Sequence, residues 1–223
     1  MENYFRLLER NHHWAESVRR EDPEYFARRE KAQAPHFLFI GCSDSRITAD
    51  RLTGTEPGEM FVHRNIANQV FPNDLNVLSV LQYAVEVLDV KHVIVCGHYG
   101  CGGVKAAFAD DVHYGLVDYW LADIRATRRR FRPQIDALPD PGARLDRLVE
   151  LNVLRQVANL ADTVVVRSAW ERGRRPLLHG LVYSLHDGHL RELVRGVDGP
   201  EAALAILRDA AGLDAHGNIP IEP

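Results

Sequence analysis

Two short apolar runs, each followed by metal-ligand side chains, constrain the fold of this chain most strongly. Residues 37–41 read Phe-Leu-Phe-Ile-Gly and precede Cys42, and residues 92–97 precede His98 and Cys101. Continuous apolar runs of this length that close with glycine are typical of strands buried in a parallel sheet. Ligands collect at the carboxyl ends of such strands, so we expect Cys42, His98 and Cys101 to lie close together.

Two thiolates and one imidazole form a ligand set that suits zinc, with a fourth position left for water or substrate. A structural role is the alternative, because free cysteines are often buried and a His-x-x-Cys spacing also arises by chance. Asp44 and Arg46, which follow the first thiol, favour the metal site, since charged groups at a strand end are costly to bury unless they are paired. Cys96 lies inside the second run and is expected to be a core residue.

The longer pattern around these residues resembles the zinc motif of the β-class carbonic anhydrases, and it consists of Cys42-x-Asp44-x-Arg46 and His98-x-x-Cys101-Gly102-Gly103. Further similar segments are residues 56–59, 61–68 and 168–173, so the resemblance covers most of the chain. It implies one Zn2+ per chain, reversible hydration of carbon dioxide to bicarbonate and a proton by zinc-bound hydroxide, and a homodimer or a dimer of dimers.

The resemblance implies two states for the Asp44–Arg46 pair. Asp44 either accepts a hydrogen bond from zinc-bound water, or binds zinc itself and excludes water, with Arg46 releasing or holding the carboxylate. The resemblance also maps a substrate pocket, which consists of Gln33, Phe61, Ile66, Tyr83 and Gly102. Taken alone, Phe61 and Ile66 are typical of core residues and Gln33 of a surface position.

A second bicarbonate pocket occurs in a regulated bacterial subclass of this family, and the matching residues here are Phe39, Arg64 and Tyr183. The subclass has tryptophan where this chain has Phe39. Phenylalanine keeps the aromatic body but lacks the indole N–H donor. We therefore expect a pocket that binds bicarbonate more weakly, while an alternative role for Arg64 is a salt bridge in a subunit interface.

Apolar residues at helical spacing between the two runs predict an α/β fold, with a mostly parallel central β-sheet flanked by helices and an N-terminal helical arm. Helices are expected over residues 4–20, 23–26, 74–88, 102–108, 116–131, 144–160 and 201–211. Further strands are expected over 59–63 and 180–186, with a turn at Asp187-Gly188. We expect a single domain over 1–223, with the arm over 1–33, the zinc-site core over 34–190, and a C-terminal helix and tail over 191–223.

Composition excludes several other classes of protein. The 223 residues are 46% hydrophobic and carry a net charge of -4, so no excess of positive charge would attract nucleic acid. No apolar run approaches the roughly 20 residues that span a bilayer, and no membrane partner is expected. Residues 1–30 mix acidic and basic side chains, unlike a signal or transit peptide, so the expected compartment is the cytoplasm.

Two other functions fit the same motif. The first is hydrolysis of carbon disulfide or carbonyl sulfide on the same fold and zinc site. The second is a catalytically silent, zinc-binding interaction module. The presence of both Asp44 and Arg46 favours an enzyme.

Overall fold

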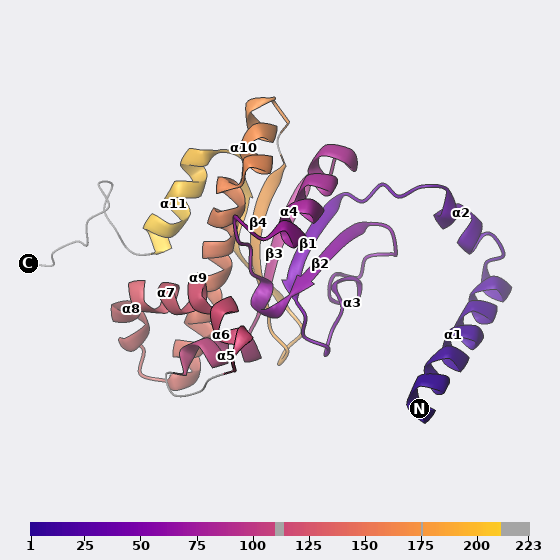
Figure 1. Cartoon of the computed structure of the whole chain (residues 1–223), viewed down its shortest axis with the longest axis horizontal. Helices are drawn as coiled ribbons and strands as arrows, with labels where there is room; N and C mark the ends of the chain where they lie inside the picture. The colour runs from indigo at the N-terminus through magenta and orange to yellow at the C-terminus, as the bar shows by residue number, and fades with distance from the viewer. Residues whose placement is uncertain (110–113, 175, 211–223) are drawn as a thin grey trace, which may run out of the picture. The chain divides into compact units, whose positions relative to one another are not determined.

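The core of the protein is built around a central β-sheet (Figure 1). The computed structural model describes residues 1–109, 114–174 and 176–210. Within them the sheet has five strands in the order β2-β1-β3-β4-β5, of which only β5 is antiparallel to its neighbour. The strands are β1 Phe37–Cys42, β2 Met60–Asn65, β3 His92–His98, β4 Leu177–Tyr183 and β5 Leu190–Val197.

The strand register explains why distant residues meet at one edge of the sheet. Gly41 lies opposite Cys96, so the parallel strands β1 and β3 end side by side. Alternate residues of β1 face opposite sides: Leu38 belongs to the larger apolar core, and Phe39 to a smaller core on the other side. The apolar runs are thus buried on both faces, and the predicted mostly parallel α/β fold is confirmed.

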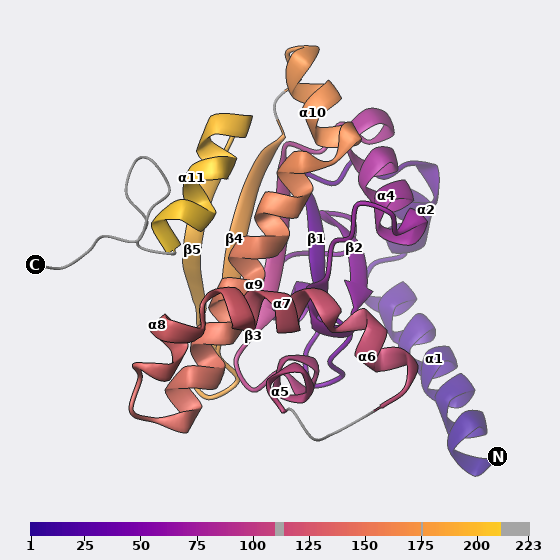
Figure 2. The ribbon, with the colours of Figure 1, turned by 60° about the vertical axis from the view of Figure 1, so that its left-hand side comes forward.

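Most helices of the core unit lie over one face of the sheet (Figure 2). The long helix α9, Pro141–Asp162, packs on β3 and β4, while residues of α3, Ala49–Thr53, join the smaller core. The other helices of the core unit are α4 Leu75–Gln82, α5 Gly102–Phe108, α6 Leu116–Trp120, α7 Ala122–Arg130, α8 Arg132–Asp136, α10 Val164–Glu171 and α11 Pro200–Ala210, with the short turns η1 Ile66–Asn68 and η2 Tyr83–Val87.

Two predicted helices differ in detail from those observed. The helix expected over 116–131 is divided into α6 and α7 by the fully buried Leu121, and α8 continues the path with Pro133 in its first turn. The sequence offers Asn73 or Asp74 as the cap of the helix expected over 74–88, and the Asp74 side chain caps it, but the helix continues as the π-helical turn η2. Apolar residues on two faces of this helix also predict that it is largely buried, which is wrong at Leu75 and Val87, because they are 81% and 62% exposed.

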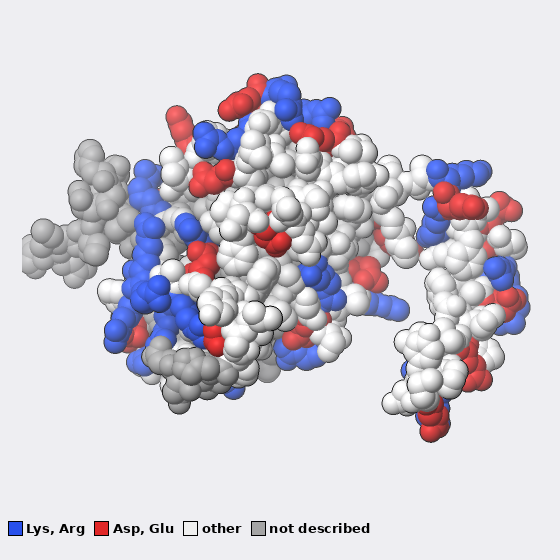
Figure 3. Space-filling model, viewed as in Figure 1, with Lys and Arg blue, Asp and Glu red and all other residues white. Residues whose placement is uncertain are grey.

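Arginines gather at the end of α7, as the sequence indicates. Arg128, Arg129 and Arg130 occupy its last turn, where positive charge complements the helix dipole. Figure 3 shows basic side chains on the side of the core unit that contains α7 and α8. Arg128 also lies over the ring of Phe108, 4.3 Å from its centroid, so part of this cluster is involved in packing.

The N-terminal residues Met1–Ala34 form a separate compact unit, and the core unit begins at Pro35. This first unit consists of α1 Glu2–Glu21 and α2 Tyr25–Lys31, joined by an edge-on contact between Trp14 and Phe26. Neither helix contains a buried residue. Among the described helices of the whole chain, none is both long enough and apolar enough to cross a bilayer.

Candidate metal centre

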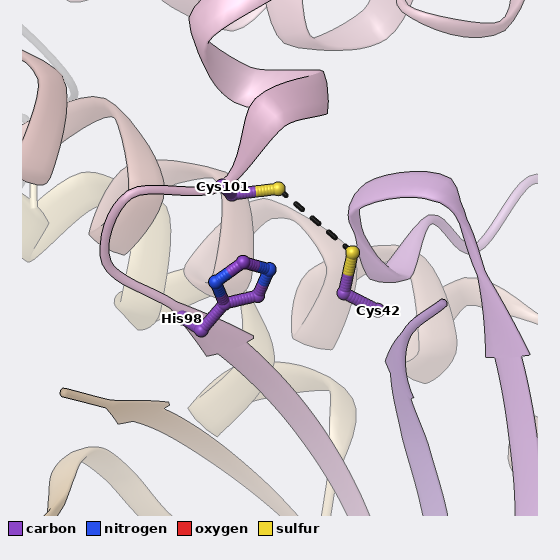
Figure 4. A group of neighbouring side chains, drawn as sticks. All are labelled: Cys42, His98 and Cys101. Carbon is purple, nitrogen blue, oxygen red and sulfur yellow. Dashed lines mark hydrogen bonds between the residues drawn. The ribbon is translucent and has the colours of Figure 1, made fainter. Parts of the chain in front are cut away.

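Cys42, His98 and Cys101 come together at the carboxyl ends of β1 and β3 (Figure 4). Cys42 and His98 are the last residues of their strands, and Cys101 immediately precedes α5. The two Sγ atoms are 3.9 Å apart, and one ligand atom of each residue lies within 4.8 Å of the others. The strand-end prediction for these three residues is therefore confirmed in its geometry.

The donor atoms fit a zinc ion. Two sulfurs bound to tetrahedral zinc at about 2.3 Å lie about 3.8 Å apart, close to the separation observed here. His98 is 2% exposed, and its Nε2 has no hydrogen-bond partner within the described part of the chain, which is costly for a buried nitrogen unless a ligand binds it. The other ring nitrogen, Nδ1, donates to the Tyr99 carbonyl oxygen at 3.1 Å and so leaves Nε2 free to bind a metal.

The two thiols influence each other's protonation. A hydrogen bond from the Cys101 thiol, assisted by His98, lowers the pKa of Cys42 to about 4. The negative sulfur of Cys42 in turn raises the pKa of Cys101, and burial raises it further. One thiolate therefore forms readily at neutral pH, while a cation between the sulfurs is required to stabilise the second.

Arg46 holds the carboxylate of Asp44 beside this group. The guanidinium donates from Nε to Oδ1 at 2.9 Å and from Nη2 to Oδ2 at 2.7 Å, and the Arg46 backbone N–H also donates to Oδ1. These bonds to Arg46 lower the pKa of Asp44 to about 2. Asp44 Oδ2 lies 3.8 Å from His98 Nε2, so an ionised acceptor faces the metal position without belonging to the three-ligand group.

Phe39, Arg64 and Tyr183 line a small cavity below the Cys42–Asp44 segment. Its volume is about 20 Å³. The Arg64 guanidinium donates to the backbone carbonyls of Cys42 at 2.7 Å, Asp44, and Ile47 at 3.1 Å. The buried hydroxyl of Tyr183 has no hydrogen-bond partner among the described residues. The predicted trio is thus assembled, but Arg64 is already engaged by backbone oxygens.

The predicted substrate pocket is only partly assembled in one chain. Ile66 begins the turn that follows β2, and Gly102 directly follows Cys101, so both lie near the metal ligands. Phe61 contacts Tyr83, with ring centroids 5.9 Å apart. However, Phe61 lies four positions before Asn65, the residue that pairs with Cys42. At about 3.3 Å per residue this places Phe61 roughly 13 Å from that end of the sheet.

The remaining predicted pocket residue, Gln33, lies in the N-terminal unit and is exposed. Its assignment to the pocket stays a prediction.

Sequence reasoning missed several residues that support the ligands. The Tyr99 hydroxyl donates to Glu150 on α9 at 2.9 Å and anchors the loop between His98 and Cys101. Ala67 donates its backbone N–H to Cys42 Sγ at 3.4 Å. Asn152 and Gln156 of α9 bond to the backbone of Ala67 and Val70 in the segment that follows β2. Their spacing of four residues among apolar neighbours was a sequence signal that could have identified them as buried polar groups with such a role.

Comparison with known proteins agrees with this geometry. The family model described as carbonic anhydrase matches residues 37–190. The carbonic anhydrase of Emericella nidulans is 45% identical over 84% of this chain and 82% of its own length, and that of Pseudomonas aeruginosa is 39% identical over 84% of each.

Solved structures agree as well. A tetrameric β-carbonic anhydrase of Sordaria macrospora has a TM-score of 0.83 at 37% identity, covering 88% of this chain and 100% of that one. The Coccomyxa β-carbonic anhydrase in complex with acetazolamide also has a TM-score of 0.83, at 40% identity and 92% coverage of both chains. The chain therefore belongs to the β-class carbonic anhydrases, the family of zinc enzymes that its ligand motif predicts.

Proposed function

We propose that this enzyme catalyses the reversible hydration of carbon dioxide to bicarbonate and a proton at the centre formed by Cys42, His98 and Cys101. The observation that carries the proposal is the three-ligand group with the Asp44 carboxylate held beside it, 3.8 Å from His98 Nε2. When bound there, zinc supplies the Lewis acidity that makes a hydroxide nucleophile available near neutral pH.

Asp44 and Arg46 orient the attacking water. The ionised carboxylate accepts a hydrogen bond from this water, which directs an oxygen lone pair at the carbon of the substrate. Arg46 fixes the carboxylate through three side-chain hydrogen bonds, and these must break before Asp44 can move onto the metal and exclude water. The paired arrangement supports an open site, and closure by Asp44 is the proposed inactive state.

The substrate pocket is completed by a second copy of the chain. Phe61 lies too far along β2 to reach the metal ligands of its own chain, and Tyr83, at the start of η2, contacts its ring. Tyr83 and Ile66 are 45% and 43% exposed. A homodimer would bury these side chains and bring the aromatic pair of one copy to the site of the other, and two such dimers can form a tetramer. Gln33 is proposed to donate an amide N–H to bicarbonate.

The regulatory part of the proposal is weak bicarbonate binding near Phe39, in a chain that resembles the bicarbonate-regulated bacterial subclass. The cavity of about 20 Å³ has room for little more than one water molecule. Bicarbonate would have to displace the bonds from Arg64 to the backbone carbonyls.

We therefore expect crystals soaked in bicarbonate to show lower anion occupancy at Arg64 and Tyr183 than relatives that carry tryptophan at the position of Phe39. Equal occupancy under the same soak would contradict the expected weakening.

The domain organisation and compartment are proposed on the same basis. The chain acts as a single domain over 1–223, in which the helical arm reaches across the partner subunit. The segment 191–223, predicted to hold only a C-terminal helix and tail, begins with most of strand β5. Its first residues therefore also complete the sheet. A reducing compartment, the cytoplasm, keeps the thiols of Cys42 and Cys101 available for zinc.

The proposed activity is tested by stopped-flow hydration of carbon dioxide on protein of measured zinc content. We expect fast hydration that is proportional to zinc, rises with pH, and is lost when a chelator removes the metal. Assays with carbon disulfide and carbonyl sulfide on the same samples separate the neighbouring hydrolase. Full zinc content without hydration at any pH would refute the proposal. If carbon disulfide and carbonyl sulfide were not hydrolysed either, the catalytically silent zinc-binding module would be the remaining function.

A further inference from the structure

Two consecutive residues beside the metal centre have a left-handed backbone. Ala67 has φ 60° and Asn68 has φ 51°, although neither is glycine. Both are buried, at 0% and 1% exposure. A residue with a Cβ rarely adopts this conformation, so the surrounding structure must hold it there.

This turn directs a backbone donor at a metal ligand. The N–H of Ala67 lies 3.4 Å from Cys42 Sγ and donates to it. The β1–β2 pairing brings the two together, because Asn65, two residues earlier, lies opposite Cys42. A rotation of the Ile66–Ala67 peptide, or a change in the left-handed φ of Ala67, would therefore turn the N–H away from the sulfur.

Two buried side-chain amides hold the other side of the same residue. The carbonyl oxygen of Ala67 accepts from Gln69 Nε2 at 2.7 Å and from Asn152 Nδ2 at 3.1 Å. Gln69 Nε2 also donates to Asn152 Oδ1 at 2.8 Å, which fixes the two amides against each other. Asn152 belongs to α9, so a helix more than eighty residues away in sequence holds the Ala67–Asn68 peptide, which is joined through the Cα of Ala67 to the peptide that carries the N–H.

A second residue of α9 holds the chain just after the Ala67–Asn68 turn, and α5 packs against the other side of this turn. Gln156 Oε1 accepts from the Val70 N–H at 2.8 Å and so fixes the chain after the turn. A Cβ on Gly103 would lie 2.9 Å from Ile66 Cγ2 and 3.1 Å from Ala67 Cβ. Glycine therefore allows the turn to pack tightly against α5, the helix that directly follows Cys101.

We propose that Gln69 and Asn152 are positioning residues that hold the Ala67 N–H on the Cys42 sulfur and thereby tune this ligand. The N–H bond orients Cys42 and draws electron density from its thiolate, which adjusts the zinc centre without direct contact with metal or substrate. This inference rests on the zinc centre of the proposed function and adds the residues that set the strength of one ligand.

Cobalt substitution offers a test, because the thiolate-to-cobalt charge-transfer band reports on the sulfur itself. In Asn152→Leu we expect the band to shift to lower energy, since a thiolate that has lost a hydrogen bond gives up charge more easily. We also expect zinc affinity to fall by about 10- to 100-fold in chelator competition. Gln69→Met keeps the length of the side chain and should shift the band in the same direction. This variant also tests the inference if Asn152→Leu does not fold.

Asn159→Leu is the matched control. Asn159 lies on α9 and donates to the Val70 carbonyl oxygen and to Gln156 Oε1, but it makes no hydrogen bond to Ala67. Its band position and zinc affinity should match the wild type. An unchanged band in folded Asn152→Leu and Gln69→Met, or an equal shift in Asn159→Leu, would overturn the inference. If the wild type showed no carbon dioxide hydration but the band still shifted in Asn152→Leu and Gln69→Met, the proposed activity would be refuted and this inference would stand.

Discussion

Replacement of Asp44 by asparagine is expected to lower kcat/KM for carbon dioxide hydration by about 10²- to 10⁴-fold, the contribution typical of a positioned proton acceptor. Asparagine keeps the shape of the side chain but loses its charge. The hydrogen bonds of Arg46 to the carboxylate then become weaker, and the attacking water loses an ionised acceptor. Zinc content should stay at the wild-type level, because Asp44 is not one of the three grouped ligands.

The pH profile of this variant separates the two roles of Asp44. Arg46 lowers the pKa of Asp44 from 3.8 to about 2, so the charge of this group is constant at neutral and mildly acidic pH. Its contribution to stability is present above pH 3.8 and is lost only as pH falls through about 2. We therefore expect an acidic fall of activity at milder pH to come from loss of the nucleophile, to which the proposed closure of Asp44 onto the metal would add.

We expect the wild-type rate to fall as pH decreases, and Asp44→Asn to be slower at every pH with a shallower fall, because asparagine is a weaker zinc ligand than a carboxylate. Stopped-flow assays across pH on both proteins provide the measurement. Asp50→Asn, the same chemical change at an exposed position of α3, is the control and should match the wild type. A wild-type rate in Asp44→Asn would show that this carboxylate only fixes its loop.

Local sequence patterns were sufficient to predict strands β1 and β3 and the three side chains that meet at their ends, but not strand β5. The runs before Cys42 and His98 are apolar because both faces of the sheet are covered, and the carboxyl ends of parallel strands necessarily share an edge. The cap at Asp74 and the turn at Asp187-Gly188 were predictable for the same reason, since each depends on a few neighbouring residues.

Features that depend on distant contacts could not be predicted in this way. Alanine has no intrinsic preference for positive φ, so the turn at Ala67 is fixed by its partners, including Asn152 on another element. The division of the predicted helix at Leu121 likewise follows from burial of that side chain in the core. The exposure of Leu75 and Val87 could not be predicted either, because apolar periodicity indicates only that a surface is suited to burial.

The exposed apolar surface next to the metal centre leads to the second large expected effect. On α6, Leu116 is 85% exposed and Tyr119 is 82% exposed. Trp120 of the same helix donates its indole N–H to the Ile66 carbonyl oxygen at 2.7 Å, which places α6 beside the turn that follows β2. An apolar surface of this kind at the site is suited to contact with a second copy of the chain.

The double variant Leu116→Asp, Tyr119→Asp is expected to be monomeric in sedimentation velocity, because its carboxylates would be buried without partners in the dimer. Its kcat/KM should fall by about 10²-fold or more, since Phe61 and Tyr83 of the second copy would no longer complete the pocket. Leu204→Asp is the control, because Leu204 is 74% exposed on α11, and this variant should keep the wild-type mass and rate. A monomer with full activity would contradict the shared pocket, whereas a double variant that stays dimeric would show that α6 lies outside the subunit interface.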